Sequence, residues 1–467
     1  MKKITDILLK YIQHTIILLL LLGIVGTNNV VYAISETTDS DISKQQKNKE
    51  DDRKFELNLF WEDYSDEYLS TYILEALDKN PTLKIANDRL RQSQALLGTI
   101  NAQRLPHIGV APSVYPYRSL SEKTYNSYND ITMPLFFNWE IDIFGKLSDK
   151  VQSGRYDVKI AKEDVNIKKL SLTSEICAMY FNIILTDELI ENEEEILKNL
   201  DEVLKLKKQL YEGGIIKYDD LYITEYEKIN TQNELNSLYK QRDILSHAFS
   251  FLRAAAPQED INHRTMEEMT LPFLPDTEIN SDLIFNRPDV IQAEYAIKKA
   301  AFDVKVAKKM FLPSFNLNEI VGFESFRASR LFNWESIVYQ FGAGLLLDLY
   351  TGGYKKHFLK YNKEFALEQL HKYDYTILDA VRETEDCLSS YKTDYKAYVD
   401  FKDMMENSQH YYNVAHTRYL TGIGNRIDEL DARRQYLINE NAMNKAKAAS
   451  LIDTVSLYKA LGSRIHE

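Results

Sequence analysis

The sequence contains the same unit twice. Pro81 opens a stretch that ends at Pro106, and Pro288 opens a second stretch that ends at Pro313. Each proline recurs 207 positions later (288 − 81 and 313 − 106), so the two stretches align without an insertion. A repeat of this length within one chain predicts two halves that share one architecture.

The correspondence continues downstream of these stretches. The matched residues are Asp142 with Asp348, Cys177 with Cys387, and Gly214 with Gly422, at offsets of 206, 210 and 208 positions. We expect a first repeat over residues 60–270, a linker over 271–286 and a second repeat over 287–467. The function must then be one that a pseudo-symmetric structure, built from two similar halves, can perform.

The N-terminus has the pattern of an export signal. Lysines in the first ten residues precede an apolar run from Ile16 to Val25, and small residues follow up to Ala33. The run is shorter than the roughly 20 apolar residues of a membrane helix. We therefore expect residues 1–33 to be a cleaved signal peptide, with an uncleaved anchor as the alternative. Residues 34–59 are polar and lack an apolar period, which predicts a flexible arm.

The charge and the cysteines restrict the choice of partners and cross-links. A formal net charge of −13 argues against nucleic acid or an anionic lipid surface as a partner. The two cysteines, Cys177 and Cys387, occupy matching positions of the repeat. Equivalent points in two similar halves need not lie within reach of a disulfide, so we interpret both as small residues that pack between helices.

Each repeat begins with a helix whose ends are marked by proline. We predict one helix from Pro81 to about Arg104 and another from Pro288 to about Phe311. Proline is tolerated in the first turn of a helix, where its missing N–H has no partner to lose. Each helix then meets a Leu-Pro pair, and proline cannot continue a helix.

A pair of extended segments follows each of these helices. The pairs cover residues 107–117 and 131–143 in the first half, and 313–326 and 336–350 in the second. Strands of about ten residues cross a bilayer when they are tilted, although short surface hairpins are the alternative. Four strands cannot close a membrane barrel, because the smallest has about eight, and an open sheet in lipid leaves backbone groups unpaired. If these strands span a membrane, several chains must share one barrel.

The remaining parts of each half have apolar residues at coiled-coil spacing. Two segments without proline run from about Lys146 to Tyr211 and from about Asp219 to Leu252. The apolar residues are Ile196, Leu200, Val203 and Leu210, then Leu235, Leu238, Leu245, Phe249 and Leu252, and in the second half Ala448, Leu451, Val455 and Tyr458. A helix of about 60 residues is roughly 90 Å long. These segments therefore predict long, rod-like helices that extend well beyond the length of an ordinary globular helix.

Several motifs resemble those of one known family. Arg-Pro-Asp-Val at 287–290 and Phe-Leu-Pro-Ser-Phe at 311–315 resemble the second-repeat signature of TolC-like outer membrane efflux factors. The run Trp-Glu-Ile-Asp-Ile-Phe-Gly-Lys at 139–146 resembles the segment where that family's second strand enters its long helix. Phe-Trp at 60–61 and Asn-Pro at 80–81 resemble its mature N-terminal region. The resemblance extends from about Phe60 to Gly462.

The resemblance implies a mainly α-helical protein with a membrane β-barrel. It implies a homotrimer in which each protomer gives four strands to a single 12-stranded outer membrane barrel and long helices to a periplasmic α-barrel. Such a channel would receive substrates from an inner membrane pump of the RND type through a periplasmic membrane fusion adaptor. The outer membrane component of a type I protein secretion system is the alternative.

Anchoring is expected to differ from that of many relatives. Many pump-associated members of the family carry a lipid on the first mature cysteine, whereas this chain has no cysteine before Cys177. We therefore expect the barrel alone to hold the protein in outer membrane lipid.

Two matching motifs mark the far ends of the long helices, Tyr211-x-x-Gly214 and Tyr419-x-x-Gly422. Glycine has the backbone freedom that a sharp helix reversal needs. The resemblance places both motifs at the periplasmic tip and implies that the adaptor contacts them. The residues of these turns are Gly213, Gly214, Lys217, Gly422, Gly424 and Asn425. An ordinary interhelical turn is the alternative.

The resemblance also implies a gate at this tip. In the family, carboxylates six and nine residues after the second-half glycine line the closed entrance, and here Asp428 and Asp431 hold those positions. Residues three apart on a helix share a face, so three-fold symmetry would form two acidic rings that attract cations. Tyr419 matches an aromatic gate position. A helix N-terminal charge on a solvated face is the alternative for both aspartates.

One position of the gate differs from the family pattern. Gly424 stands where some relatives have an arginine that ties the closed state, and Arg426 or Arg418 are the candidates to replace it.

Other classes of protein have less support. No His-Glu-x-x-His or Gly-x-Ser-x-Gly motif occurs, and Gly342-Ala343-Gly344 lacks the third glycine of a dinucleotide loop. We therefore expect no catalytic, cofactor or metal site. A soluble periplasmic coiled-coil scaffold is the remaining alternative, and it explains the coiled-coil spacing but not the duplicated strand pairs.

Overall fold

The computed structural model describes residues 60–121, 124–257, 261–272 and 281–462, all within one compact unit that begins at Leu57. The expected signal peptide (1–33) and flexible arm (34–59) lie outside the described residues. So do residues 273–280 of the expected linker and the last five residues of the expected second repeat.

The helices of the two halves have equal lengths. The 22-residue pair is α5 (Pro81–Ala102) and α8 (Pro288–Lys309), the 67-residue pair is α6 (Lys146–Glu212) and α9 (Tyr354–Leu420), and the 36-residue pair is α7 (Tyr218–Arg253) and α10 (Arg426–Leu461). Short elements precede the first helix of each half: η1 (Phe60–Tyr64) and α4 (Glu67–Lys79), and η2 (Ser281–Asn286). The helices predicted to start at Pro81 and Pro288 are confirmed, and at 1.5 Å per residue the longest ones reach about 100 Å.

One antiparallel sheet joins the two halves. Its strands are β1 (His107–Val110), β2 (Ser113–Ser121), β3 (Thr124–Ile141), β4 (Ser314–Ser325) and β5 (Ile337–Leu346). β1 and β2 follow each other along one edge of β3, and β4 and β5 continue the sheet on the other edge. The sheet is therefore four strands wide, as predicted. The strand predicted over 107–117 is interrupted before Pro112, a residue that has no N–H for strand pairing.

Three strand predictions were wrong at one end. Residues 118–121 and 124–130, which the prediction left outside any strand, extend the paired strands β2 and β3 beyond Ser325, the last residue of β4. Their Ser, Asn and charged residues obscured the strand pattern, and pairing within the hairpin supplies the hydrogen bonds. β5 was predicted to continue to Tyr350 but ends at Leu346, because Leu346 pairs with Ser314 and β4 begins there.

The register gives the sheet one apolar face. Leu135 lies opposite Val321, which lies opposite Tyr339, and every second residue of a strand shares a face. This apolar face consists of Ile108, Val110, Ile131, Met133, Leu135, Phe137, Trp139, Ile141, Phe315, Leu317, Glu319, Val321, Phe323, Ser325, Ile337, Tyr339, Phe341, Ala343 and Leu345. Its polar members are Glu319 and Ser325. The opposite face is rich in Asn, Gly and charged residues, which is the alternation of a sheet between an apolar medium and water.

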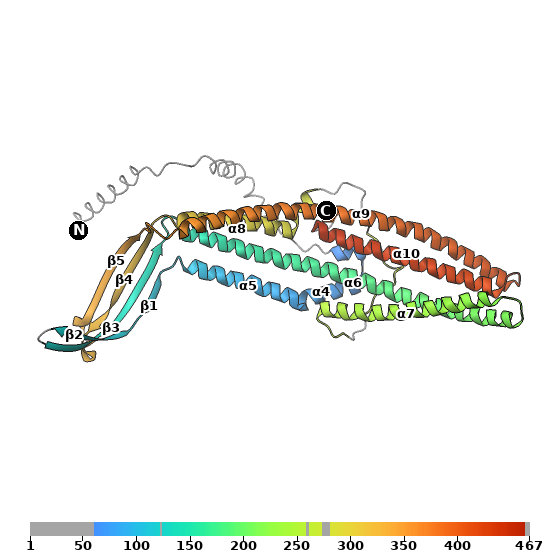
Figure 1. Cartoon of the computed structure of the whole chain (residues 1–467), viewed down its shortest axis with the longest axis horizontal. Coiled ribbons are helices and arrows are strands. Elements are labelled where there is room, and N and C mark those ends of the chain that lie inside the picture. Colours follow the sequence, from blue (N-terminus) through green and yellow to red (C-terminus); the bar gives the residue numbers. More distant parts are fainter. Residues whose placement is uncertain (1–59, 122–123, 258–260, 273–280, 463–467) are drawn as a thin grey trace. The chain divides into compact units, whose positions relative to one another are not determined.

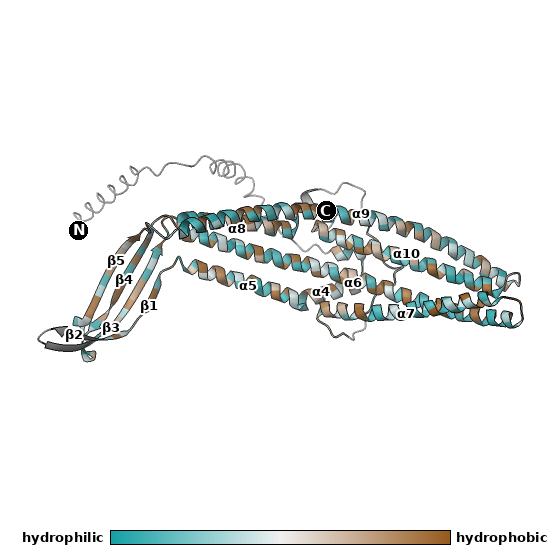
Figure 2. Ribbon diagram, viewed as in Figure 1, coloured by the Kyte–Doolittle hydropathy of each residue, from teal (hydrophilic) through white to brown (hydrophobic). Residues whose placement is uncertain are grey.

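The strands lie at one end of the helices, and the α6–α7 and α9–α10 turns lie at the other (Figure 1). Hydrophilic and hydrophobic residues are interspersed along the long helices (Figure 2). Among the described residues, no helix has a stretch apolar and long enough to span a membrane.

Matching hydrogen bonds join the residue before α5 to the end of α7 and the residue before α8 to the end of α10. In the first half, Asn80 Nδ2 donates to the Leu252 carbonyl of α7 at 2.7 Å. In the second half, Arg287 Nη1 donates to the Ala460 carbonyl of α10 at 2.5 Å. The residue before each proline therefore makes the same closing contact, at offsets of 207 (287 − 80) and 208 (460 − 252) positions.

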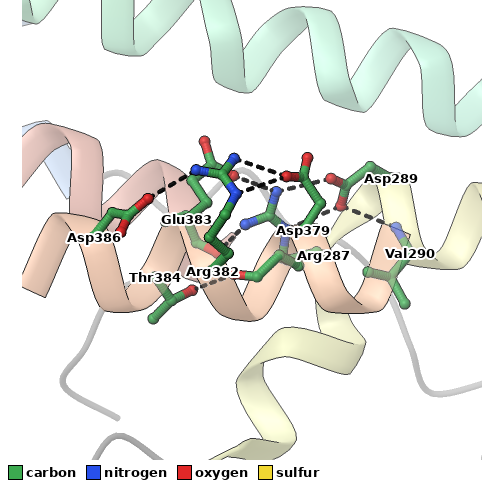
Figure 3. A network of polar contacts seen from close by, with 10 residues as sticks. Arg287, Asp289, Val290, Asp379, Arg382, Glu383, Thr384 and Asp386 are labelled. Atoms are coloured by element: carbon green, nitrogen blue, oxygen red, sulfur yellow. Dashed lines mark hydrogen bonds and ion pairs between the residues drawn. The ribbon is translucent and has the colours of Figure 1, made fainter. Parts of the chain in front are cut away.

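The second-half contact is part of an ionic network around a buried arginine (Figure 3). The Arg287 side chain is 10% exposed and pairs with Asp289 at 2.8 Å and with Glu383 of α9 at 2.7 Å. Burial lowers the pKa of Arg287, but hydrogen bonds to Asp289 and Glu383 outweigh that effect and raise it above its usual range. This arginine therefore connects α8, α9 and α10 as a permanent cation.

A second ionic contact fastens the segment after α7 to α6. His263 Nε2 lies 2.8 Å from Asp187 Oδ2, and Asp187 Oδ1 accepts a hydrogen bond from Arg242 at 2.5 Å. The hydrogen bond with Asp187 raises the pKa of His263 against the effect of burial. Burial raises the pKa of Asp187, but hydrogen bonds from His263 and Arg242 outweigh it, so this pKa is lowered.

We expect the His263→Ala variant to lose thermal stability mainly at mildly acidic pH. Because the folded-state pKa of His263 is raised, its contribution is complete below the unfolded value of about 6.5 and disappears as pH rises through the folded value. Because the folded-state pKa of Asp187 is lowered, its contribution to stability is present above the unfolded-state pKa of about 3.9. That contribution is lost as pH falls through the folded-state pKa. The loss should therefore be greater at about pH 5.5 than at about pH 8. Thermal unfolding followed by circular dichroism checks this, with the exposed His247→Ala of α7 as control; equal losses at both pH values would contradict the ion pair.

Candidate functional site at the helix tips

Both interhelical turns use glycine at one position where a left-handed backbone is required. Gly214 has φ of +72° and Gly422 has φ of +76°. The amide after each closes the helix, with Ile215 N donating to Leu210 O at 2.8 Å and Ile423 N donating to Arg418 O at 2.9 Å. This is a helix C-cap built on glycine, in which a side chain would be strained. The backbone freedom predicted for the two turns therefore lies at Gly214 and Gly422.

The other residues predicted at the turns have more local roles. Gly213 has the helical φ of −76° and is the C-cap of α6, while Lys217 is the N-cap of α7, with its N–H 3.4 Å from Asp220. A Cβ at Gly424 would lie 3.0 Å from Cβ of Arg418 and 3.2 Å from N of Tyr419. An arginine at position 424 would therefore require these neighbours to shift by a few tenths of an ångström.

Asp428 belongs to the cap of α10. Its N–H donates to Asn425 Oδ1 at 2.7 Å, and its Oδ2 accepts from Asn425 Nδ2 at 2.7 Å. This reciprocal arrangement satisfies an N–H of the first helical turn, and the carboxylate lies at the positive end of the helix dipole. The capping role considered from the sequence is present, and the carboxylate of Asp428 remains exposed.

Asp431 and Tyr419 each face an arginine. Asp431 Oδ1 lies 3.0 Å from Arg434, which also approaches Glu227 of α7 at 3.7 Å. The guanidinium carbon of Arg426 lies 5.3 Å from the ring centre of Tyr419. The three residues predicted for the gate are thus close to the second turn, and two of them contact arginines of α10.

A buried carboxylate behind the second turn was missed by sequence reasoning. Glu429 is 3% exposed, and its two oxygens meet Arg426 and Nδ1 of His416, the latter at 2.6 Å. Arg426 also binds Glu202 of α6 through both carboxylate oxygens, at 2.8 and 3.0 Å. Hydrogen bonds to Glu202 and Glu429 raise the pKa of Arg426, and the bond from Arg426 lowers the pKa of Glu202. We call Arg426, Glu202, Glu429 and His416 the tip network.

The tip network joins three helices near the start of α10. Seven positions from Glu202 on α6 and from Arg426 on α10, Arg433 binds Glu195 at 2.6 and 2.8 Å. Between these two ion pairs, Asn199 of α6 donates to the Leu430 carbonyl at 2.8 Å. Of the two arginines considered from the sequence, Arg426 is the one that pairs with carboxylates. Glu202 is 224 positions from its partner, so no local pattern could have identified it.

The tip of the first half has different chemistry at the matching positions. Tyr218, Tyr222 and Tyr226 form an exposed aromatic row on α7, where α10 has Arg426, Leu430 and Arg434. Ile223, also exposed, takes the place of Asp431. At the positions that match Asp428 and Asp431, the first half therefore has one carboxylate, Asp220, where the second half has two.

The comparison with protein families identifies the family to which this chain belongs. The family described as outer membrane efflux protein matches residues 72–250 and 280–463. The chain belongs to the outer membrane efflux protein family. The TolC-like resemblance carried by the short motifs is therefore confirmed, and the family match also falls into two segments.

Relatives of this efflux protein cover most of its length. A probable efflux pump outer membrane protein of Pseudomonas putida, TtgC, is 24% identical over 421 residues, which are 86% of this chain and 84% of TtgC. The cation efflux system protein CusC of Escherichia coli is 22% identical over 414 residues, 85% of this chain and 87% of CusC. The solved outer-membrane channel OprN has a TM-score of 0.79 and 23% identity, with 88% of this chain and 93% of that chain covered.

These similarities place the efflux protein in the outer membrane, with its long helices in the periplasm. They confirm the predicted fold class, mainly helical with strands of a membrane β-barrel. The apolar face of the sheet is then the lipid-facing surface and the opposite face lines water. The turn between β4 and β5 marks the outer end of the barrel, because α8 precedes β4 and α9 follows β5 at the periplasmic end.

Proposed function

We propose that the protein is a passive exit duct, a homotrimer that receives substrates from an RND-type inner membrane pump through a periplasmic adaptor. The observation that supports this most directly is the four-strand sheet with an apolar face. Its outer strands, β1 with β2 and β5, end the sheet, and a sheet edge in lipid would leave backbone groups unpaired. Three copies supply the 12 strands that close a barrel around water. The repeats 60–270 and 287–467 then form similar sectors of the wall.

Membrane fractionation and assembly test this proposal. The protein should remain in outer membranes after a carbonate wash and migrate as a heat-sensitive trimer, whereas a periplasmic scaffold would be released. A deletion strain should become more sensitive to substrates of one pump, and the adaptor of that pump should be recovered with the tagged channel. A carbonate-soluble monomer would overturn the proposal.

We propose that the adaptor contacts the two glycine turns and that the gate lies beside the second turn. The proposed contact residues are Gly213, Gly214, Lys217, Gly422, Gly424 and Asn425. Asp428, Asp431 and Tyr419 form the proposed entrance, and three protomers would bring six carboxylates together. The tip network supports this assignment, because it connects the start of α10 with α6 and α9 directly behind these residues. Arg426 then takes the role of the arginine that holds the closed state in some relatives.

Removing the two gate carboxylates is expected to raise single-channel conductance and to weaken block by multivalent cations in planar bilayers. Alanine at both positions removes the charge, but at 428 it also removes a cap contact. The double variant Asp428→Asn, Asp431→Asn is therefore the sharper test, because asparagine retains acceptors for Asn425 and Arg434. Asp220→Asn at the first-half tip is the matched control. Unchanged conductance and unchanged cation block would remove both residues from the gate.

A further inference from the structure

The turn between β4 and β5, residues 326–336, has an ordered conformation at the outer end of the barrel. It contains η3 (Ala328–Arg330) and η4 (Trp334–Ser336). Ser336 Oγ donates to the Arg330 carbonyl at 2.8 Å, and Leu331 and Ser336 are buried. We call residues 326–336 the outer loop. These contacts fix the backbone of the outer loop.

Aromatic residues of the outer loop continue the lipid-facing surface. The Phe332 ring packs edge-on against Phe323 of the apolar face, with ring centres 5.5 Å apart. Trp334 is 87% exposed, and Tyr339, the third residue of β5 on the same face, is 82% exposed. Aromatic rings at the end of a membrane barrel lie at the level of the lipid headgroups.

The outer loop also contains two cations. Arg327 and Arg330 are exposed, and in the part of the chain that the structure describes neither guanidinium has an ion-pair partner. Arg287, Arg426 and Arg433, in contrast, each bind a carboxylate. The outer loop contains two arginines and one acid, Glu335, in a chain whose net charge is −13. The outer loop is therefore locally cationic, and the negative net charge of the whole chain does not argue against anionic lipid at this loop.

We propose that the outer loop binds the phosphorylated glycolipid of the outer leaflet, with Arg327 and Arg330 on its phosphates and Phe332 and Trp334 against its acyl chains. Guanidinium groups bind phosphate through two parallel hydrogen bonds. A lipid fits better than a soluble partner because the rings adjoin the lipid-facing surface through Phe323. The proposal rests on the proposed function, since the outer loop reaches this leaflet only if the strands span the outer membrane.

The test measures binding of diphosphoryl lipid A to the purified full-chain trimer in detergent by native mass spectrometry. At about a kcal/mol per arginine near an anionic lipid, the Arg327→Gln, Arg330→Gln variant should bind roughly thirtyfold more weakly. Arg327→Lys, Arg330→Lys should keep most of the binding, and the exposed Arg89→Gln on α5 should leave it unchanged. Dephosphorylated lipid A should bind the wild type no more tightly than diphosphoryl lipid A binds the glutamine variant.

Two results would overturn the proposal: equal affinity of the glutamine variant and the wild type for lipid A, or equal affinity of the wild type for phosphorylated and dephosphorylated lipid. Conductance of the same wild-type preparation in planar bilayers separates this failure from a failure of the channel assignment. A conducting trimer without a phosphate preference refutes the lipid site alone, whereas a preparation that forms no channel refutes the proposed function.

Discussion

Replacing Arg426 with glutamine should raise the single-channel conductance of the trimer several-fold. Arg426 ties the first turn of α10 to Glu202 of α6 and supplies the permanent cation for Glu429, which is 3% exposed. Removing one partner of a buried ion pair costs about 3–5 kcal/mol. The start of α10 then loses its tie to α6, and the proposed gate residues on its first turns are free to move apart.

The matched control is Arg382→Gln on α9, which removes an exposed arginine paired with Asp379 and Asp386 away from the tip. Exposed pairs contribute about 0–1 kcal/mol, so this variant should conduct like the wild type. Glu202→Gln should reproduce part of the Arg426 effect, and the double variant should exceed Arg426→Gln by little if the two side chains act as one contact. Conductance of Arg426→Gln equal to that of Arg382→Gln would refute the tie.

Replacing Arg287 with alanine should produce the largest loss of stability. The substitution leaves the carboxylates of Asp289 and Glu383 without their shared cation (Figure 3). It also leaves the Ala460 carbonyl without its donor. The loss of folding free energy should be below the roughly 3–5 kcal/mol of a fully buried pair, because the two carboxylates left unpaired are each 35% exposed. Heat dissociation of the trimer and thermal unfolding by circular dichroism measure it.

Two further variants separate charge from geometry at this position. Arg287→Lys keeps a cation but loses the planar fork that reaches two carboxylates and a carbonyl together, so we expect an intermediate loss. Asn80→Ala removes the matching contact of the first half, where a neutral amide bonds the Leu252 carbonyl, and it also removes the N-cap of α5, which accepts from Thr82 N and Leu83 N. At about 1 kcal/mol for each role, it should cost about 2 kcal/mol. An Arg287→Ala variant as stable as Arg382→Gln would contradict the role of the network.

Local sequence rules were sufficient for the helices and for the repeat. Proline at positions 81 and 288 starts a helix for reasons confined to one turn of backbone, and the structure begins α5 and α8 there. Gly214 and Gly422 were predictable in the same way, because a left-handed residue after a helix favours glycine. The strand ends were less predictable. Where β5 ends depends on where its partner β4 begins, and that is a property of the pair.

The duplicated order of elements, the family and the positions of the gate candidates along the chain could all be read from the amino-acid sequence. Which side chains meet became known from the fold: the caps and arginines around Asp428 and Asp431, the pairing of Arg426 with Glu202, and the lipid-facing register of the sheet. The difference comes from the range of the interactions. Helix starts and glycine turns are decided within a few residues, whereas ion pairs and strand register join positions that are distant in the chain and become neighbours only when it folds.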